Sequence, residues 1–232
     1  MEMKILIVIP AYNEELNIER VVSNLINNYP QYDYVIVNDG STDKTGVICR
    51  KHGRNLIDLP VKLGLTWAVQ AVMKYAVKHG YDAVLQYDGD GQHRAEFIEK
   101  MKEEMVSSNA EIIIGSRFVS EKKPSSLRML GGNIISMIIK LSTGQKITDP
   151  TSGMRLFGKN VLLEFSRDIN YGPEPDTISY LIKQGVKVEE IQVYMDERIA
   201  GESYLNVIRS IKYMVLMSFS ILFIQNFRRG RK

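Results

Sequence analysis

Two carboxylates that stand one residue apart, at the end of a hydrophobic run, are the side chains in this sequence best suited to chemistry. Asp88 and Asp90 are separated by Gly89, which lets the backbone bend so that both can face one divalent cation. Mg²⁺ and Mn²⁺ prefer carboxylate and amide oxygens, and Gln92 could add one. His93 is a candidate nitrogen ligand. Such a pair alone is common in solvated turns, but its place after a strand-like run favours a metal site.

Two further polar segments also follow apolar runs and could bind a nucleoside. Asp39 could accept hydrogen bonds from a nucleobase or a ribose, Tyr12 could line a base, and Glu14 could hydrogen-bond the nucleoside. The structural alternative for this region is helix capping, which we expect of Ser41 or Asp43.

Four arginines stand close to Gly- or Ser-containing segments: Arg117, Arg128, Arg155 and Arg198. Arginine pairs bidentately with phosphate. Any one of them is more often a surface or salt-bridge residue, but the set favours the handling of phosphate groups.

The elements that must position these residues alternate between apolar runs and amphipathic patterns. We predict strands at 4–9, 34–37, 56–59, 83–87, 111–115 and 187–193, and helices at 14–28, 43–52, 64–79, 95–107, 128–141 and 176–184. The segment 149–155 is expected to be a loop. This alternation indicates an α/β domain with a mainly parallel sheet. Because ligands of such sheets bind beyond the carboxyl ends of the strands, we expect the three polar segments to converge on one crevice.

The C-terminal part, 204–232, differs from the rest. Its predicted helix, 204–227, has no charge from Tyr213 to Phe227, and four basic residues follow within 228–232. Fifteen helical residues span only about 22 Å, less than the roughly 30 Å of a hydrocarbon core. We therefore expect an amphipathic, membrane-associating helix anchored by the basic tail, or one that docks on a membrane partner. A buried core helix is the structural alternative.

Composition limits the class of protein. The chain has 232 residues and 44% hydrophobic content, enough for one sizeable core, and the net charge of +3 gives no indication of nucleic acid. Cys49 is the single cysteine and no cleavable signal precedes the first run, so we expect a cytoplasmic protein.

The order of these motifs resembles family 2 of the inverting glycosyltransferases, which have the GT-A fold. The resemblance rests on the segments 10–15, 38–43 and 88–93. The segments 115–117, 149–155 and 198–203 are similar to the polyprenyl-phosphate branch of that family, whose best-known members are dolichol-phosphate mannosyltransferases. The resemblance to family 2 implies a GT-A domain over residues 1–203.

The resemblance implies a metal-dependent transfer of sugar from a nucleotide-diphosphate sugar, with uridine favoured, to a polyprenyl phosphate at the cytoplasmic membrane face. The residues that would bind the donor are Pro10, Tyr12, Glu14, Asp39 and Asp88. Those that would hold Mg²⁺ or Mn²⁺ are Asp88, Asp90 and Gln92. The acceptor phosphate would contact Arg117, Arg128, Arg155, Arg198 and Ser203. The catalytic set would be Asp88, Asp90, Arg117 and Arg198.

Two departures affect the sugar and the acceptor: Tyr204 stands where the family often has lysine, and the segment 172–176 is rich in proline. Many relatives add transmembrane helices, whereas this chain has a single C-terminal apolar segment, so we expect it to associate peripherally with the membrane surface. A separate small membrane protein is a candidate partner, and no nucleic acid is expected.

Other functions predict different chemistry. Transfer to a hydroxyl of a glycan or lipid-linked saccharide needs a base, for which Asp149, Glu174 and Asp176 are candidates. A polyprenyl phosphate, with a second pKa of about 6, needs none. A non-catalytic nucleotide-binding scaffold would bind donor without turnover. A nucleotidyltransferase is disfavoured, because Tyr12 and Asn13 stand where a Gly- and Arg-rich loop would be needed.

Overall fold

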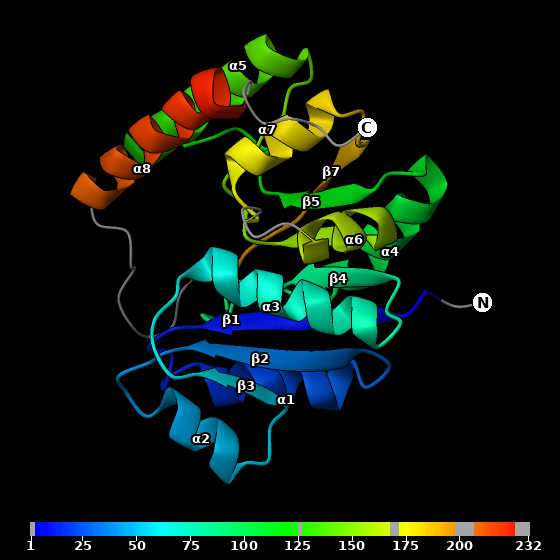
Figure 1. Ribbon diagram of the computed structural model, residues 1–232, viewed down its shortest axis with the longest axis vertical. Coiled ribbons are helices and arrows are strands. Elements are labelled where there is room, and N and C mark those ends of the chain that lie inside the picture. Colours follow the sequence, from blue (N-terminus) through cyan, green and yellow to red (C-terminus); the bar gives the residue numbers. More distant parts are fainter. Residues whose placement is uncertain (1–2, 125–126, 168–171, 198–206, 226–232) are drawn as a thin grey trace.

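The computed structural model describes residues 3–124, 127–167, 172–197 and 207–225, and shows a seven-stranded sheet between two layers of helices (Figure 1). The strands lie in the order β3-β2-β1-β4-β6-β5-β7. Their bounds are β1 (Ile5–Ala11), β2 (Asp33–Asp39), β3 (Leu56–Leu59), β4 (Ala83–Gln86), β5 (Ile112–Ser116), β6 (Arg155–Gly158) and β7 (Val188–Gln192). Neighbouring strands are parallel except β6, which is antiparallel to both β4 and β5.

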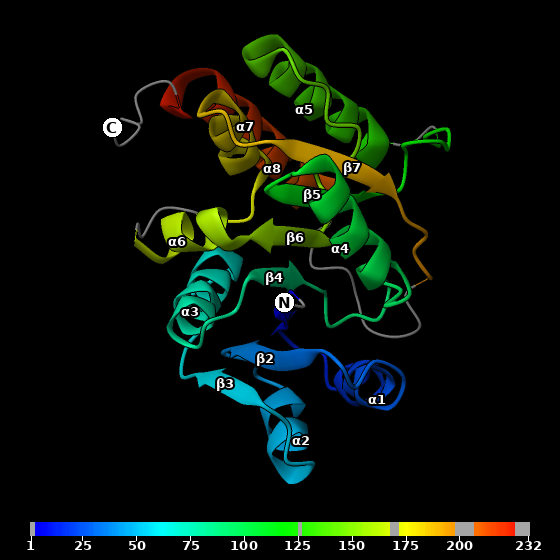
Figure 2. The ribbon, with the colours of Figure 1, turned by 90° about the vertical axis from the view of Figure 1, so that its right-hand side faces the viewer.

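The helices cover both faces of the sheet, which explains why the first strand is apolar throughout. They are α1 (Ile18–Asn28), α2 (Thr45–Lys51), α3 (Leu65–Lys78), α4 (Phe97–Ser108), α5 (Leu127–Thr143), α6 (Lys159–Arg167), α7 (Pro175–Lys183) and α8 (Val207–Phe219). One core packs α3, α5, α6 and α7 against Leu6 and Val8, and the other packs α1 and α4 against Ile5, Ile7 and Ile9. Figure 2 shows α3 and α6 on one side of the sheet and α1 and α4 on the other. Strands buried on both faces lack polar alternation.

The predicted elements are found with shifted ends, but the sequence interpretation missed β6 and α6. The segment 149–155 was predicted to be a loop as far as Arg155, whereas the first strand residue is Arg155 itself. Between Arg155 and Gly158 this strand has only two apolar residues, Leu156 and Phe157, so it shows no apolar run of its own, and its partners β4 and β5 are distant in sequence. This antiparallel strand separates β4 from β5 in the sheet.

The C-terminal helix α8 continues into a π-helical turn, Ser220–Ile224, and rests on α5 and α7. Met214 and Met217 pack against the core, and a Cβ on Gly131 of α5 would overlap the sulfur of Met214, so the two helices approach closely. The opposite side of α8 exposes Val215 and Phe219, at 62% and 54%. Within the described ranges, no helix is both long enough and apolar enough to span a membrane.

Candidate active site

A pocket of about 320 Å³ opens where β1, β2 and β4 end. Its lining residues are Pro10, Ala11, Tyr12, Glu14, Asp39, Lys62, Gly64, Leu65, Ala68, Asp88, Gly89 and Asp90. All three polar segments therefore meet in one pocket, which confirms the predicted convergence. The reason is topological, because the carboxyl ends of neighbouring parallel strands lie at one edge of the sheet.

Asp39 closes one side of this pocket by holding the segment before α3. Its carboxylate accepts hydrogen bonds from the backbone N–H groups of Leu63, at 2.7 Å, and Gly64, at 2.9 and 3.1 Å. Gly40 adopts a φ of +63°, and a Cβ there would clash with the backbone of residues 61 and 62. The Lys62 ammonium lies 3.3 Å from the ring centroid of Tyr12. Asp39 is thus buried and fixed, and its neighbours bring a cation and an aromatic ring to the pocket.

The turn that carries Asp88 and Asp90 is held by His93. The imidazole is buried, and its Nδ1 accepts the backbone N–H of Asp88 at 2.9 Å. The hydroxyl of Tyr87 donates to the carbonyl of His93. Nε2 lies 3.7 Å from Oδ2 of Asp88. Because Nδ1 is an acceptor, the neutral ring carries its proton on Nε2, facing the carboxylate. His93 therefore orients Asp88 and is not placed as a cation ligand.

The carboxylate of Asp88 also depends on the absence of a side chain at Gly153. A Cβ on Gly153 would lie 2.9 Å from Cγ of Asp88 and 3.1 Å from Oδ1, and nearer still to Oδ2. Gly153 lies in the segment between α5 and β6, so this segment, distant from Asp88 in sequence, limits the space available to its carboxylate.

The structure does not bring Gln92 into the pocket. Its amide Nε2 donates to the carbonyl of Asp196 at 3.3 Å, while its backbone N–H donates to Oδ1 of Asp90 at 3.0 Å. Across the part of the chain that the structure describes, no three His, Cys, Asp or Glu side chains are gathered as a metal site. Asp88 and Asp90 nevertheless fit a hard cation, since Mg²⁺ is commonly held by one or two carboxylates together with substrate phosphates.

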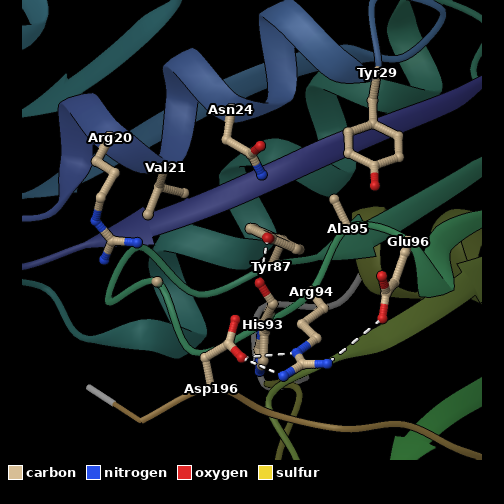
Figure 3. Close-up of a pocket in the computed structure, with 11 residues that line it drawn as sticks. Arg20, Val21, Asn24, Tyr29, Tyr87, His93, Arg94, Ala95, Glu96 and Asp196 are labelled. Atoms are coloured by element: carbon tan, nitrogen blue, oxygen red, sulfur yellow. Dashed lines mark hydrogen bonds and ion pairs between the residues drawn. The ribbon is translucent and has the colours of Figure 1, made fainter. Parts of the chain in front are cut away.

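A second cavity, of about 520 Å³, lies behind this turn and shows a feature that the motifs did not indicate (Figure 3). Arg94 donates to Asp196 at 2.7 Å, and Asp196 donates its backbone N–H to the carbonyl of Gln92 at 2.8 Å. His93 and Met195 form an isolated bridge. The segment that leads to 198–203 is therefore fastened beside the turn of Asp88 and Asp90. Arg198 and Ser203 themselves lie outside the described residues, as does the side chain of Arg128.

Arg117 forms a bidentate ion pair with Asp149. Its Nε lies 2.7 Å from Oδ2 and its Nη2 2.8 Å from Oδ1, while the backbone N–H of Arg117 also donates to Asp149. Asp149 is only 2% exposed, whereas the Arg117 side chain is 23% exposed. Asp149 thus serves as the counter-ion of Arg117, which is not the position of a general base.

Arg155 requires a correction, because its position is not that of a ligand to an acceptor phosphate. It is buried, and its two terminal nitrogens donate to the backbone carbonyls of Pro173 and, at 2.6 Å, Pro150. Burial lowers the pKa of the guanidinium. Arg155 pairs with Gln86 in the β4–β6 register, so the strand that the sequence interpretation missed carries it into the interior. There it ties two loops together.

The other two candidate bases hold the C-terminal helix in place. The hydroxyl of Tyr213 donates to Glu174, and burial raises the pKa of Glu174. Asp176 accepts hydrogen bonds from Ser220 at 2.6 Å and from Gln225 at 2.9 Å. These contacts join the start of α7 to α8 and its π-helical turn, and neither carboxylate lines the pocket of Asp88 and Asp90.

Comparisons with known proteins agree with this geometry. Residues 6–165 match the model of the family described as glycosyl transferase family 2. The chain is 27% identical over 217 residues to an undecaprenyl-phosphate mannosyltransferase of Micrococcus luteus, covering 88% of each chain. It is 33% identical over 193 residues to a UDP-N-acetylglucosamine–dolichyl-phosphate N-acetylglucosaminyltransferase of Methanococcus voltae, covering 71% of this chain and 73% of the relative.

Solved structures show the same fold. A mannosyltransferase of Pyrobaculum calidifontis, in complex with GDP-Man and Mn²⁺, matches with a TM-score of 0.69 at 15% identity, over 100% of this chain and 66% of that one. Glucosyl-3-phosphoglycerate synthase of Mycobacterium tuberculosis, with Mn²⁺, UDP and phosphoglyceric acid, matches with a TM-score of 0.66 at 15% identity, over 98% and 80%. The predicted GT-A-like α/β fold, with its mainly parallel sheet between helices, is confirmed. Because the family model matches residues 6–165, more than half of the chain, the chain belongs to glycosyl transferase family 2.

Proposed function

We propose that this chain transfers a sugar from a nucleotide-diphosphate sugar to a polyprenyl phosphate at the cytoplasmic face of a membrane, with inversion at the anomeric carbon. The observation that carries the proposal is the single pocket that gathers Asp39, Asp88 and Asp90 from the ends of neighbouring strands. Relatives named for undecaprenyl-phosphate and dolichyl-phosphate acceptors support the choice of acceptor.

The donor would occupy this pocket with its nucleoside between Tyr12, Glu14 and Asp39, beside Pro10. We propose a uridine diphosphate sugar, because the 33% identical relative is named for one. Asp88 and Asp90 would hold Mg²⁺ or Mn²⁺. A cation bound there would neutralise the negative charge that develops on the departing diphosphate.

The reaction would be a direct displacement. An oxygen of the acceptor phosphate attacks the anomeric carbon through an oxocarbenium-like transition state, and the bond to the nucleoside diphosphate breaks with its electron pair on the leaving oxygen. An ionised phosphate acceptor needs no general base. Asp149, Glu174 and Asp176 all serve other contacts, which favours this acceptor over a hydroxyl.

Arginines would bind the acceptor phosphate. We propose Arg117, which is fixed by Asp149 and partly exposed, together with Arg128, Arg198 and Ser203. Asp196, which precedes Arg198 by two residues in the sequence, is attached beside the turn of Asp88 and Asp90. Exposed apolar side chains on α8 support peripheral membrane association, with a separate small membrane protein as a proposed partner.

The test is to incubate purified protein with Mn²⁺ or Mg²⁺, a panel of nucleotide sugars and short polyprenyl phosphates. We expect a glycosylated lipid phosphate that Asp90→Ala abolishes. Glu103→Ala, which removes an exposed carboxylate of α4, is the matched control and should leave the product unchanged. Nucleoside diphosphate release only with a saccharide acceptor would favour transfer to a hydroxyl. Donor binding without turnover on any acceptor would favour a scaffold.

A further inference from the structure

A third cavity, of about 430 Å³, lies between α5 and the segments 118–123 and 146–148, and it shares no lining residue with the pocket of Asp88 and Asp90. Its charged lining residues are three lysines, Lys123, Lys140 and Lys146, against one carboxylate, Glu121. The cavity therefore has an excess of positive charge, and no part of the proposed glycosyl transfer uses it.

One of these lysines is held in place. Nζ of Lys123 donates to Oδ1 of Asn133 on α5 at 2.7 Å and lies 5.5 Å from the ring centroid of Phe118. Burial lowers the pKa of Lys123, and the carboxylates of Asp149 and Glu190 oppose that effect. Lys140 and Lys146, which also line the cavity, are exposed. A fixed, partly desolvated ammonium with two further ammonium groups beside it suits a phosphate group.

An apolar stripe runs along the same helix. Leu130, Ile134, Met137 and Leu141 of α5 are 57%, 40%, 56% and 77% exposed. Their spacings of four, three and four residues place them on one face of the helix. Met137 belongs to both the stripe and the cavity. A soluble phosphate compound would leave this stripe in water, whereas the acyl chains of a lipid would cover it.

We propose that this cavity binds the phosphate headgroup of an anionic membrane phospholipid, whose acyl chains lie along the stripe of α5. The proposal deepens the proposed function, since it rests on the chain working at a membrane surface, and it concerns a lipid other than the acceptor. Anionic headgroups attract lysines that lie close to the bilayer surface. Bound in this way, α5 and its neighbour α8 would face the bilayer together, at the end of the molecule opposite α2 (Figure 1).

The first experiment measures sedimentation of the full chain with vesicles of phosphatidylcholine alone or of equal parts phosphatidylcholine and phosphatidylglycerol. A triple variant, Lys123→Gln, Lys140→Gln and Lys146→Gln, tests the cavity. Each lysine near an anionic surface contributes about fivefold in affinity, so we expect a loss on the order of 100-fold on the anionic vesicles. Binding to neutral vesicles should change little. The thermal unfolding temperature of the variant checks that it folds.

A matched triple variant controls for overall charge. Lys51→Gln, Lys74→Gln and Lys78→Gln remove the same charge from exposed positions of α2 and α3. We expect this variant to keep nearly all the affinity of the native chain for anionic vesicles. An equal loss in both triple variants would mean that only net charge matters, and that would overturn the proposal.

A second measurement locates the contact with lipid. The chain has one tryptophan, Trp67. In a Trp67→Phe background, Met137→Trp places a reporter on the stripe of α5, and Val47→Trp places one on α2, where Val47 is 55% exposed. Phosphatidylglycerol with brominated acyl chains should quench the fluorescence of the Met137→Trp protein and not that of the Val47→Trp protein. Equal quenching of the two, or none at position 137, would contradict the proposal.

Two other results would assign the cavity to a different ligand. A raised KM for polyprenyl phosphate in detergent without phospholipid, together with unchanged vesicle binding in the lysine triple variant, would make it part of the acceptor site. Displacement of the protein from vesicles by inorganic phosphate, at constant ionic strength, would make it a soluble-anion site. Asp90→Ala should still bind anionic vesicles, so a failure of glycosyl transfer can be told apart from a failure of lipid binding.

Discussion

Replacing Gly153 with alanine tests whether the position of Asp88 determines the chemistry. The added Cβ would lie 2.9 Å from Cγ of Asp88, and ordinary contact begins at 3.4 Å, so the carboxylate must withdraw by at least 0.5 Å at Cγ. It must move further at Oδ2, which is nearer. The backbone of Asp88 is held by His93, so we expect the side chain to rotate. Misplacing a catalytic group by about 1 Å can reduce the rate about 100-fold.

The assay is kcat for glycosyl transfer to a short polyprenyl phosphate, measured as a function of Mn²⁺ concentration. We expect Gly153→Ala to lower kcat by about 100-fold and to raise the Mn²⁺ concentration needed for half-maximal rate. Stability should change little, because the Asp88 side chain is 37% exposed and can swing outward. Gly132→Ala on α5, where a Cβ meets nothing within 4 Å, is the control. It should keep full activity and gain about 0.5–1 kcal/mol of stability from the better helix former.

A native kcat together with a native Mn²⁺ dependence in Gly153→Ala would refute the reasoning. That outcome would mean that Asp88 does not act from the place that the structure gives it. A large loss of stability with native activity per folded molecule would show that Gly153 is needed only for packing.

Three further predictions concern buried groups. Asp149→Asn should weaken the ion pair with Arg117 and lower the free energy of unfolding in urea by about 2–3 kcal/mol. Asp82→Asn, at the exposed pair with Lys159, should lower it by less than about 1 kcal/mol. Equal losses in the two variants would contradict the burial argument. Burial raises the pKa of Glu174 above 4.5, so the folded state holds this proton more tightly and stability falls as pH rises above 4.5. Glu174→Gln should flatten that fall, and an unchanged slope of stability against pH would argue against it. Burial also raises the pKa of Cys49 to about 11, so iodoacetamide at mildly alkaline pH should modify it only in urea, and rapid native labelling would contradict this.

The sequence alone was enough to predict the part of the molecule that carries the pocket of Asp39, Asp88 and Asp90. Its strands are continuous apolar runs and its helices have clear amphipathic patterns, so local periodicity identifies both. The ends of β1, β2 and β4 then fall together because parallel strands point the same way. This topological rule brought Tyr12, Asp39 and Asp88 to one pocket without knowledge of any distant contact. The family and the GT-A-like fold followed from the same motifs.

The second half was decided by contacts between residues that are distant in sequence. Arg155 was expected in a loop as a ligand of the acceptor phosphate, yet the short antiparallel strand β6 buries it. Asp149 and Glu174 were candidate bases, yet Asp149 pairs with Arg117 and Glu174 accepts a hydrogen bond from Tyr213. A contact between two residues that are distant in sequence produces no periodic pattern, so the sequence does not reveal it.

The polar residues therefore fall into two groups, which differ in whether local or distant contacts determine their position. Where a residue lies just beyond the end of its own strand, as Asp90 does, the sequence determined its place, because the direction of the strand fixes the edge of the sheet at which it emerges. Where its role depends on what packs against it, as with Gln92, Asp196 and Lys123, only the tertiary structure decided it. The carboxylate, amide or ammonium group is the same in either setting, and burial and the neighbouring donor or acceptor select its function.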